Sequence, residues 1–275
     1  MKRRVILFVC LLLVFSPLDA QVNIWEGTSC HKKVKLTPYI PQAEPLAAVV
    51  VCPGGSYFWH DLRSEGSMVG EWLSSKGIAA YVLEYRVAGF ADFISGYRYL
   101  FRGNRHPDMI NDLERSISLV RNDFNGPVGV MGFSAGGHLA LSSGILSDSS
   151  SRPDFIAAVY PVITLSDEQI VHKRSRRGLL GENRVHDAAL RDSLSLENNV
   201  SPSMPPVFLV NCIDDPTVDY RNSAVMYEAL QKNNIPSLYL QFKTGGHGFG
   251  ANPQKMNDET SLWQDAFIDW LSSII

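Results

Sequence analysis

The sequence predicts an α/β protein with a mostly parallel central sheet and helices on both faces. Short apolar runs without alternation are typical of strands that are buried on both faces of a parallel sheet. Segments with apolar residues at helical spacing separate these runs, as in folds that stack helices on a sheet. The expected strands cover residues 34–40, 46–52, 78–85, 127–132, 155–162, 206–211 and 237–242, and the expected helices cover residues 64–77, 106–124, 222–234 and 258–275.

Residues 1–20 are predicted to be a secretory signal and not part of the fold. Lys2, Arg3 and Arg4 precede an apolar run over residues 5–15, and the segment ends in small residues at Ala20. The apolar run is too short to span a bilayer. We therefore expect cleavage after Ala20, export to the periplasm or beyond, and no stable membrane association of the remaining chain. An uncleaved anchor is the alternative.

Residues 21–275 are expected to form a single domain, because no repeat, low-complexity tract or linker divides them. The formal net charge of −3 gives no basic surface, so nucleic acid is not an expected partner. No spacing resembles a metal site, and no cofactor is expected. Cys30, Cys52 and Cys212 follow the signal, and three cysteines do not define a disulfide pair. The oligomeric state stays open.

The stretch "VGVMGFSAGGHLA", residues 128–140, turns from an apolar run into glycines around one serine. Ser134 stands between Gly132 and Gly136 where a strand is expected to become a helix. This G-x-S-x-G pattern is typical of an elbow that holds a nucleophilic serine in a strained backbone conformation. The following helix start offers free N–H groups to a developing oxyanion. A glycine-rich turn with a capping serine is the alternative.

A nucleophilic serine needs a histidine base, and the base needs an orienting carboxylate. In this fold class the chain order is serine, acid, histidine. His247 lies in the glycine-rich loop "KTGGHGFG" after the last expected strand, and we predict that it is the base. His172 and His186 lie in a polar segment and are the alternatives, whereas His138 is expected to pack inside the helix after the elbow.

The predicted acid follows the strand over residues 206–211, where Asp214 and Asp215 are adjacent. Two neighbouring aspartates cannot both point at one imidazole. We predict that Asp215 is the acid, with Asp214 as the alternative, and that the other carboxylate caps the next turn.

The stretch "PGGSYFW", residues 53–59, follows the expected strand 46–52. Its glycines allow the backbone to approach a substrate oxygen closely. We predict that the N–H groups of Gly55 and Ser56 join that of Ala135 in an oxyanion hole. A plain glycine turn is the alternative.

Together these motifs resemble the α/β-hydrolase family, and specifically its acetylxylan-esterase-like or BD-FAE-like branch of small carbohydrate esterases. The resemblance runs from about Ala47 onward and includes "PGGSY", "GFSAGGHLA", "DDPTV" and "GGHGFG". It implies an α/β-hydrolase fold. The roles that it implies are Ser134 as nucleophile, His247 as base, an aspartate of "DDPTV" as acid, and Gly55, Ser56 and Ala135 as oxyanion donors.

This chain departs from the family pattern at three places. Ser56 stands where the family has a glycine, and Asp219 where it has a proline. The segment over residues 88–105 is longer and more aromatic than the usual connection, and it carries Tyr97, Tyr99 and Phe101. These rings are expected to pack under the loop or to stack on sugar rings. Residues 165–204 include the charged stretch "HKRSRRGLLGENR", which we interpret as a solvated face, with a substrate rim as the alternative.

The expected function is a serine esterase that removes acetyl groups from carbohydrate, xylan-like or another acetylated glycan, through an acyl-enzyme. The bulky residues after Ser56, namely Tyr57, Phe58 and Trp59, predict a small acyl pocket. Two other classes remain as alternatives: a peptidase or amidase similar to the prolyl-oligopeptidase group, and a hydrolase-like binding protein without catalysis.

Overall fold

The computed structural model describes residues 21–94, 100, 103–148 and 150–275, so the expected signal and Tyr97, Tyr99 and Phe101 lie outside the described residues. Within this part of the chain, eight strands form one sheet in the order β1-β2-β4-β3-β5-β6-β7-β8. β2 pairs antiparallel with β1 and β4, and the other pairs are parallel. The strands are β1 (Val22–Asn23), β2 (Lys35–Tyr39), β3 (Ala48–Cys52), β4 (Ala79–Glu84), β5 (Val128–Phe133), β6 (Ile156–Val159), β7 (Val207–Cys212) and β8 (Ser237–Phe242). The predicted mostly parallel α/β sheet is confirmed.

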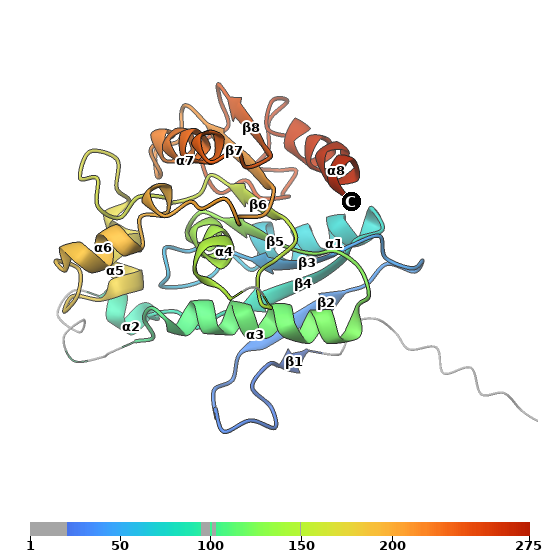
Figure 1. Cartoon of the computed structure of the whole chain (residues 1–275), viewed down its shortest axis with the longest axis horizontal. Coiled ribbons are helices and arrows are strands. Elements are labelled where there is room, and N and C mark those ends of the chain that lie inside the picture. The colour runs from blue at the N-terminus through green and yellow to red at the C-terminus, as the bar shows by residue number, and fades with distance from the viewer. Residues whose placement is uncertain (1–20, 95–99, 101–102, 149) are drawn as a thin grey trace, which may run out of the picture.

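Helices cover both faces of the sheet (Figure 1). Buried side chains of α1 and α8 pack on one face, and those of α3, α4 and α7 pack on the other. The α-helices are α1 (Met68–Ser75), α2 (Phe90–Phe93), α3 (Asp108–Asp123), α4 (Ala135–Leu146), α5 (Lys173–Leu180), α6 (Ala188–Ser193), α7 (Arg221–Lys232) and α8 (Leu262–Ile274). Shorter turns of π-helix, η1 (Arg63–Ser67), and 3₁₀-helix, η2 (Leu196–Asn198), accompany them.

Strand β3 shows how the sheet divides the core. Its five residues are all buried. Val49 and Val51 face the α1 and α8 side, whereas Ala48, Val50 and Cys52 face the α3 and α4 side. Successive side chains of a strand point to opposite faces, so a strand with helices on both sides must be apolar throughout. This burial on both faces explains why the apolar runs in the sequence do not alternate with polar residues.

The solvated-face interpretation of residues 165–204 is wrong for α5. Only its first residues, Lys173 and Arg174, are exposed, whereas Arg176 and Leu179 are buried. The Arg176 guanidinium donates to Glu168 at 2.6 Å. A charged side chain can be buried when an opposite charge compensates it, and a carboxylate eight residues away supplies that charge here. Helix α5 therefore packs against the domain, next to α2 and α6 (Figure 1).

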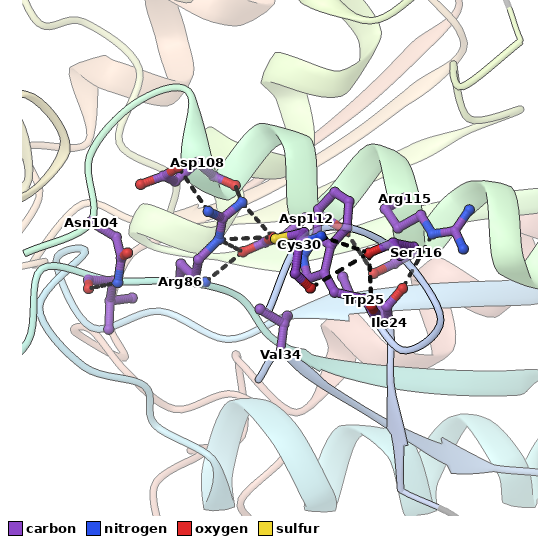
Figure 2. Close-up of polar contacts among 12 residues, drawn as sticks. Ile24, Trp25, Cys30, Val34, Arg86, Asn104, Asp108, Asp112, Arg115 and Ser116 are labelled. Carbon is purple, nitrogen blue, oxygen red and sulfur yellow. Dashed lines mark hydrogen bonds and ion pairs between the residues drawn. The ribbon is translucent and has the colours of Figure 1, made fainter. Parts of the chain in front are cut away.

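A buried ionic network ties the N-terminal segment to α3. Arg86 donates to both carboxylate oxygens of Asp112, at 2.8 Å from Nη2, and to Asp108 at 2.8 Å. The Trp25 indole N–H donates to the same Asp112 carboxylate at 2.8 Å. Figure 2 shows that Asp112 lies between Arg86 and Trp25. We call these residues the Arg86 network. It holds three distant parts of the chain together.

Cys30, Cys52 and Cys212 are all free thiols, and the latter two are buried in the core. In the ranges that the structure describes, no helix has both the length and the apolar character needed to cross a membrane.

Candidate active site

Ser134 lies in a sharp elbow between β5 and α4. Its φ is 53°, which is uncommon for a residue with a side chain. A Cβ at Gly132 would collide with the carbonyl of Gly136, and a Cβ at Gly136 with the carbonyl of Cys52. Gly132 and Gly136, the first and last residues of the elbow over residues 132–136, therefore have no room for a side chain. The turn holds Ser134 at the carboxyl ends of the parallel strands, where open α/β sheets bind ligands.

The structure joins three predicted residues in one hydrogen-bonded chain. His247 Nε2 lies 2.9 Å from Ser134 Oγ, and His247 Nδ1 lies 2.6 Å from Asp215 Oδ2. A carboxylate only accepts hydrogen bonds, so Nδ1 carries the proton and Nε2 is free to accept from the serine hydroxyl. The Asp215 side chain is buried, at 1% exposure, and that of His247 is 14% exposed. We call these three residues the triad.

The two adjacent aspartates hold different partners. Asp215 Oδ1 accepts from the amides of Thr217 and Val218, which aims Oδ2 at His247. Asp214 instead accepts from the amides of Gly246 at 2.9 Å and Gly245 at 3.2 Å. The second carboxylate thus fixes the loop that carries the histidine, residues 244–250, which we call the histidine loop.

The other candidate histidines do not reach Ser134 by a hydrogen bond. His138 is buried and bonded to the Tyr57 hydroxyl and the Leu194 carbonyl, and burial lowers its pKa to about 4. His172 Nδ1 lies 2.7 Å from the Ser175 hydroxyl. Burial, with the charge of the neighbouring His247, lowers the pKa of His172 to about 4. His186 is exposed.

The turn after β3, residues 53–56, lies against the elbow, and we call it the oxyanion turn. A Cβ on Gly54 would lie 2.9 Å from the Cβ of Ser134. Within the described chain, no residue accepts a hydrogen bond from the amides of Gly55, Ser56 or Ala135. Buried amides normally find acceptors. Three predicted donors beside the serine are therefore left available to a substrate oxygen.

The residues after the oxyanion turn do not all line the site. Tyr57 and Phe58 are each 1% exposed and belong to the interior, whereas Trp59 is 38% exposed. The two buried rings face other partners, because Tyr57 bonds His138 and Phe58 packs against the Arg177 guanidinium at 5.0 Å. The predicted narrowing of the acyl pocket by all three rings is wrong for Tyr57 and Phe58. Trp59 remains as a candidate.

Two polar residues beside the triad escaped the sequence analysis. Glu65, in η1, is 3% exposed and accepts from the amide of Gly54 at 2.7 Å. Its other oxygen accepts from the Tyr160 hydroxyl at 2.8 Å. The ring of Tyr160 lies 4.5 Å from that of His247. No local pattern marks these residues, because a glutamate in an amphipathic helix is usually exposed.

A strained serine at a strand-to-helix elbow, hydrogen bonded to histidine and aspartate on the edge of a mostly parallel sheet, defines a protein of the α/β-hydrolase fold. Residues 37–230 match the BD-FAE family. The chain belongs to this family. In the described residues, no group of three His, Cys, Asp or Glu side chains is placed to hold a metal ion.

Known proteins similar to this chain include esterases. An acetylxylan esterase of Xylanibacter ruminicola is 31% identical over 88% of this chain and 48% of the relative. The chain thus spans about half the length of that curated relative. The solved acetyl ester-xyloside bifunctional hydrolase of Caldicellulosiruptor lactoaceticus is 32% identical, covers 95% of this chain and 98% of its own, and superposes with a TM-score of 0.79. A carboxylesterase of Lactobacillus plantarum, 21% identical over 92% of this chain and 96% of its own, shares the fold with a TM-score of 0.72.

Proposed function

We propose that the chain is an exported serine esterase that removes acetyl groups from carbohydrate. One observation carries the proposal: the hydrogen-bonded triad lies beside three amides that have no acceptor in the described chain. A nucleophile, a base with an oriented tautomer and oxyanion donors are the parts that acyl transfer needs. Export rests on the basic and apolar pattern of residues 1–20.

The reaction proceeds through an acyl-enzyme. Ser134 Oγ attacks the ester carbonyl carbon while its proton passes to His247 Nε2, and the carbonyl oxygen becomes an anion held by the amides of Gly55, Ser56 and Ala135. The bond to the sugar oxygen then breaks, and that oxygen takes the proton from His247. Water repeats the sequence on the acyl-enzyme, which releases acetate and restores the serine hydroxyl. Asp215 holds the imidazole and stabilises its charged form throughout.

The substrate class is supported by the relatives. The names of the two similar proteins, an acetylxylan esterase and an acetyl ester-xyloside hydrolase, both combine an acetyl ester with a xylose-containing compound. We infer from this likeness that an acetylated glycan is the substrate.

Labelling and turnover test the proposal. A fluorophosphonate probe should label the purified chain and should fail to label Ser134→Ala. Acetate release from acetylated xylan and hydrolysis of p-nitrophenyl acetate should both be detectable and should both depend on Ser134. Absence of labelling would favour a binding protein. Faster cleavage of a peptide amide than of the acetyl ester would favour a peptidase.

A further inference from the structure

Glu65 is a buried carboxylate that the triad mechanism does not use. It lies in η1, and η1 contacts the histidine loop, since a Cβ at Gly250 would collide with the carbonyl of Ser64. A carboxylate buried in a protein is costly unless hydrogen bonds or opposite charge compensate it. The position of this one, between the oxyanion turn and the histidine loop, therefore requires an explanation.

The contacts of Glu65 connect the two loops that build the site. One oxygen accepts from the amide of Gly54 in the oxyanion turn. The other accepts from the hydroxyl of Tyr160, and this hydroxyl in turn accepts at 2.9 Å from the amide of Gly250 at the end of the histidine loop. One side chain thereby fixes the position of the loop that carries the oxyanion donors relative to the loop that carries the base.

The same contacts favour the ionised form of Glu65. Both oxygens accept hydrogen bonds from donors, and two donors to one carboxylate stabilise its charge. Burial raises the pKa of Glu65 above its ordinary value, while the charge of His247, the Tyr160 hydroxyl and the Gly54 amide act in the opposite direction.

We propose that ionised Glu65 is a positioning residue that supports the imidazolium form of His247 and ties the oxyanion turn to the histidine loop. The inference rests on the proposed function. Only the side chain of Tyr160 separates the charge of Glu65 from the imidazole of His247. The Tyr160 hydroxyl donates to Glu65, and the Tyr160 ring packs on the ring of His247. The imidazole becomes positive only when it takes the proton of Ser134, so a nearby negative charge favours that step.

Other ionisable groups surround Glu65 and His247 and also affect the electrostatics of the imidazole. Asp215 faces His247 directly, and His172 interacts electrostatically with both of them. On the side of Glu65, Asp61 is paired with Lys255 at 3.1 Å. Two buried tyrosines complete the surroundings, namely Tyr160 and Tyr85, whose pKa values burial raises well above the ordinary value. These tyrosines stay neutral over the working range, so the charge that faces His247 across Tyr160 is that of Glu65.

The test is the pH dependence of fluorophosphonate labelling, which needs a reactive Ser134–His247 pair but no carbohydrate. Glu65→Gln keeps the shape and removes the charge. The acid limb, where labelling accelerates as the imidazole loses its proton, should move down by about one pH unit. The lost support of the imidazolium should lower the plateau rate by about tenfold, because one unit and a factor of ten correspond to the same free energy.

These two effects cancel at low pH, so the wild-type and Glu65→Gln profiles should meet below the acid limb and separate above it. Glu65→Asp retains the charge but is one methylene shorter. Its acid limb should stay at the wild-type position while its plateau falls. A residue that acts only as a structural brace would lower the Glu65→Gln rate by the same factor at every pH, and that result would overturn the inference.

Tyr160→Phe keeps the test available if Glu65→Gln does not fold, as judged by its melting curve. This variant leaves the ring on His247 and removes one of the two donors that hold the charge of Glu65. We expect the same meeting of the profiles at low pH with a smaller gap at the plateau, and parallel profiles would again overturn the inference. Wild-type protein that does not label at any pH would contradict the proposed function itself.

Discussion

Two buried polar networks of this molecule differ in whether their hydrogen bonds are complete. In the Arg86 network, every nitrogen of the guanidinium has an acceptor, supplied by Asp108 and Asp112. Around the triad, three amides have no acceptor within the described chain, and Ser134 has a strained φ of 53°. A completed network stabilises the fold, whereas an incomplete and strained one is prepared for a ligand.

The difference has a thermodynamic meaning. Free donors and strain at the elbow cost stability that the rest of the fold must supply, which is common at functional sites. We therefore expect changes in the triad to affect activity with little change in stability, and changes in the Arg86 network to do the reverse.

Ser134→Ala should have the largest effect on activity. It removes the proposed nucleophile, and we expect a fall in kcat by about 10⁶-fold, the scale observed when a protease loses its serine. The melting temperature should not fall, because the hydroxyl contributes no bond to the core. Ser143→Ala is the matched control, since that buried hydroxyl bonds a carbonyl of its own helix, α4. Comparable turnover in both variants would contradict the assignment.

Replacing each of the two aspartates after β7 should lower kcat by amounts that differ by orders of magnitude. Asp215→Asn favours the wrong imidazole tautomer, and the corresponding change in a protease lowers kcat by about 10⁴-fold. Asp214→Asn weakens the hold on Gly245 and Gly246 and should cost less than about 10²-fold. Steady-state kinetics on p-nitrophenyl acetate measures both. Equal losses would mean that the two carboxylates share the role.

Asp112→Asn should lower stability and leave activity per folded molecule unchanged. Asp112 is 0% exposed, and its charge compensates that of Arg86. Breaking a buried pair costs about 3–5 kcal/mol, measurable as the free energy of unfolding in urea. Asp265→Asn is the control, because its ion pair with Lys76 is exposed and should contribute about 0–1 kcal/mol. A loss of kcat in Asp112→Asn would remove the contrast between the networks.

The sequence predicted the parts of the molecule that depend on a local pattern of residues. The strands appear as apolar runs because they are buried on both faces, and the elbow as glycines because side chains would collide there. The buried Arg176 was misjudged as solvated, since the Glu168 that compensates it is brought close only by the fold. Glu65 went unnoticed for the same reason. Its partners, Gly54 and Tyr160, lie just after β3 and β6, and no sequence spacing links them.

The choice between Asp214 and Asp215 is a second feature that the sequence alone could not decide. Both follow the same strand, and their separation into two tasks depends on the amides of residues 217 and 218 and of residues 245 and 246. Such a distribution of backbone donors is a tertiary property.

The smallest expected effect concerns Trp59, the exposed ring beside the oxyanion turn. Its indole Cδ1 lies 2.8 Å from the position that a Cβ on Gly55 would occupy, so the ring borders one of the available amides. Trp59→Ala should leave kcat/KM for p-nitrophenyl acetate within about threefold and raise the butyrate-to-acetate ratio by about tenfold, since a methylene contributes about 1–3 kcal/mol once it fits. Leu146→Ala is the control, because this side chain is similarly exposed, at 39%, at the opposite end of α4 from Ser134. An unchanged ratio in Trp59→Ala would place the acyl group elsewhere. A fall in turnover of acetylated xylan without a change in the ratio would mean that the Trp59 ring contacts the sugar and not the acyl group. The residues around the triad would then bind the substrate on the side of its leaving group.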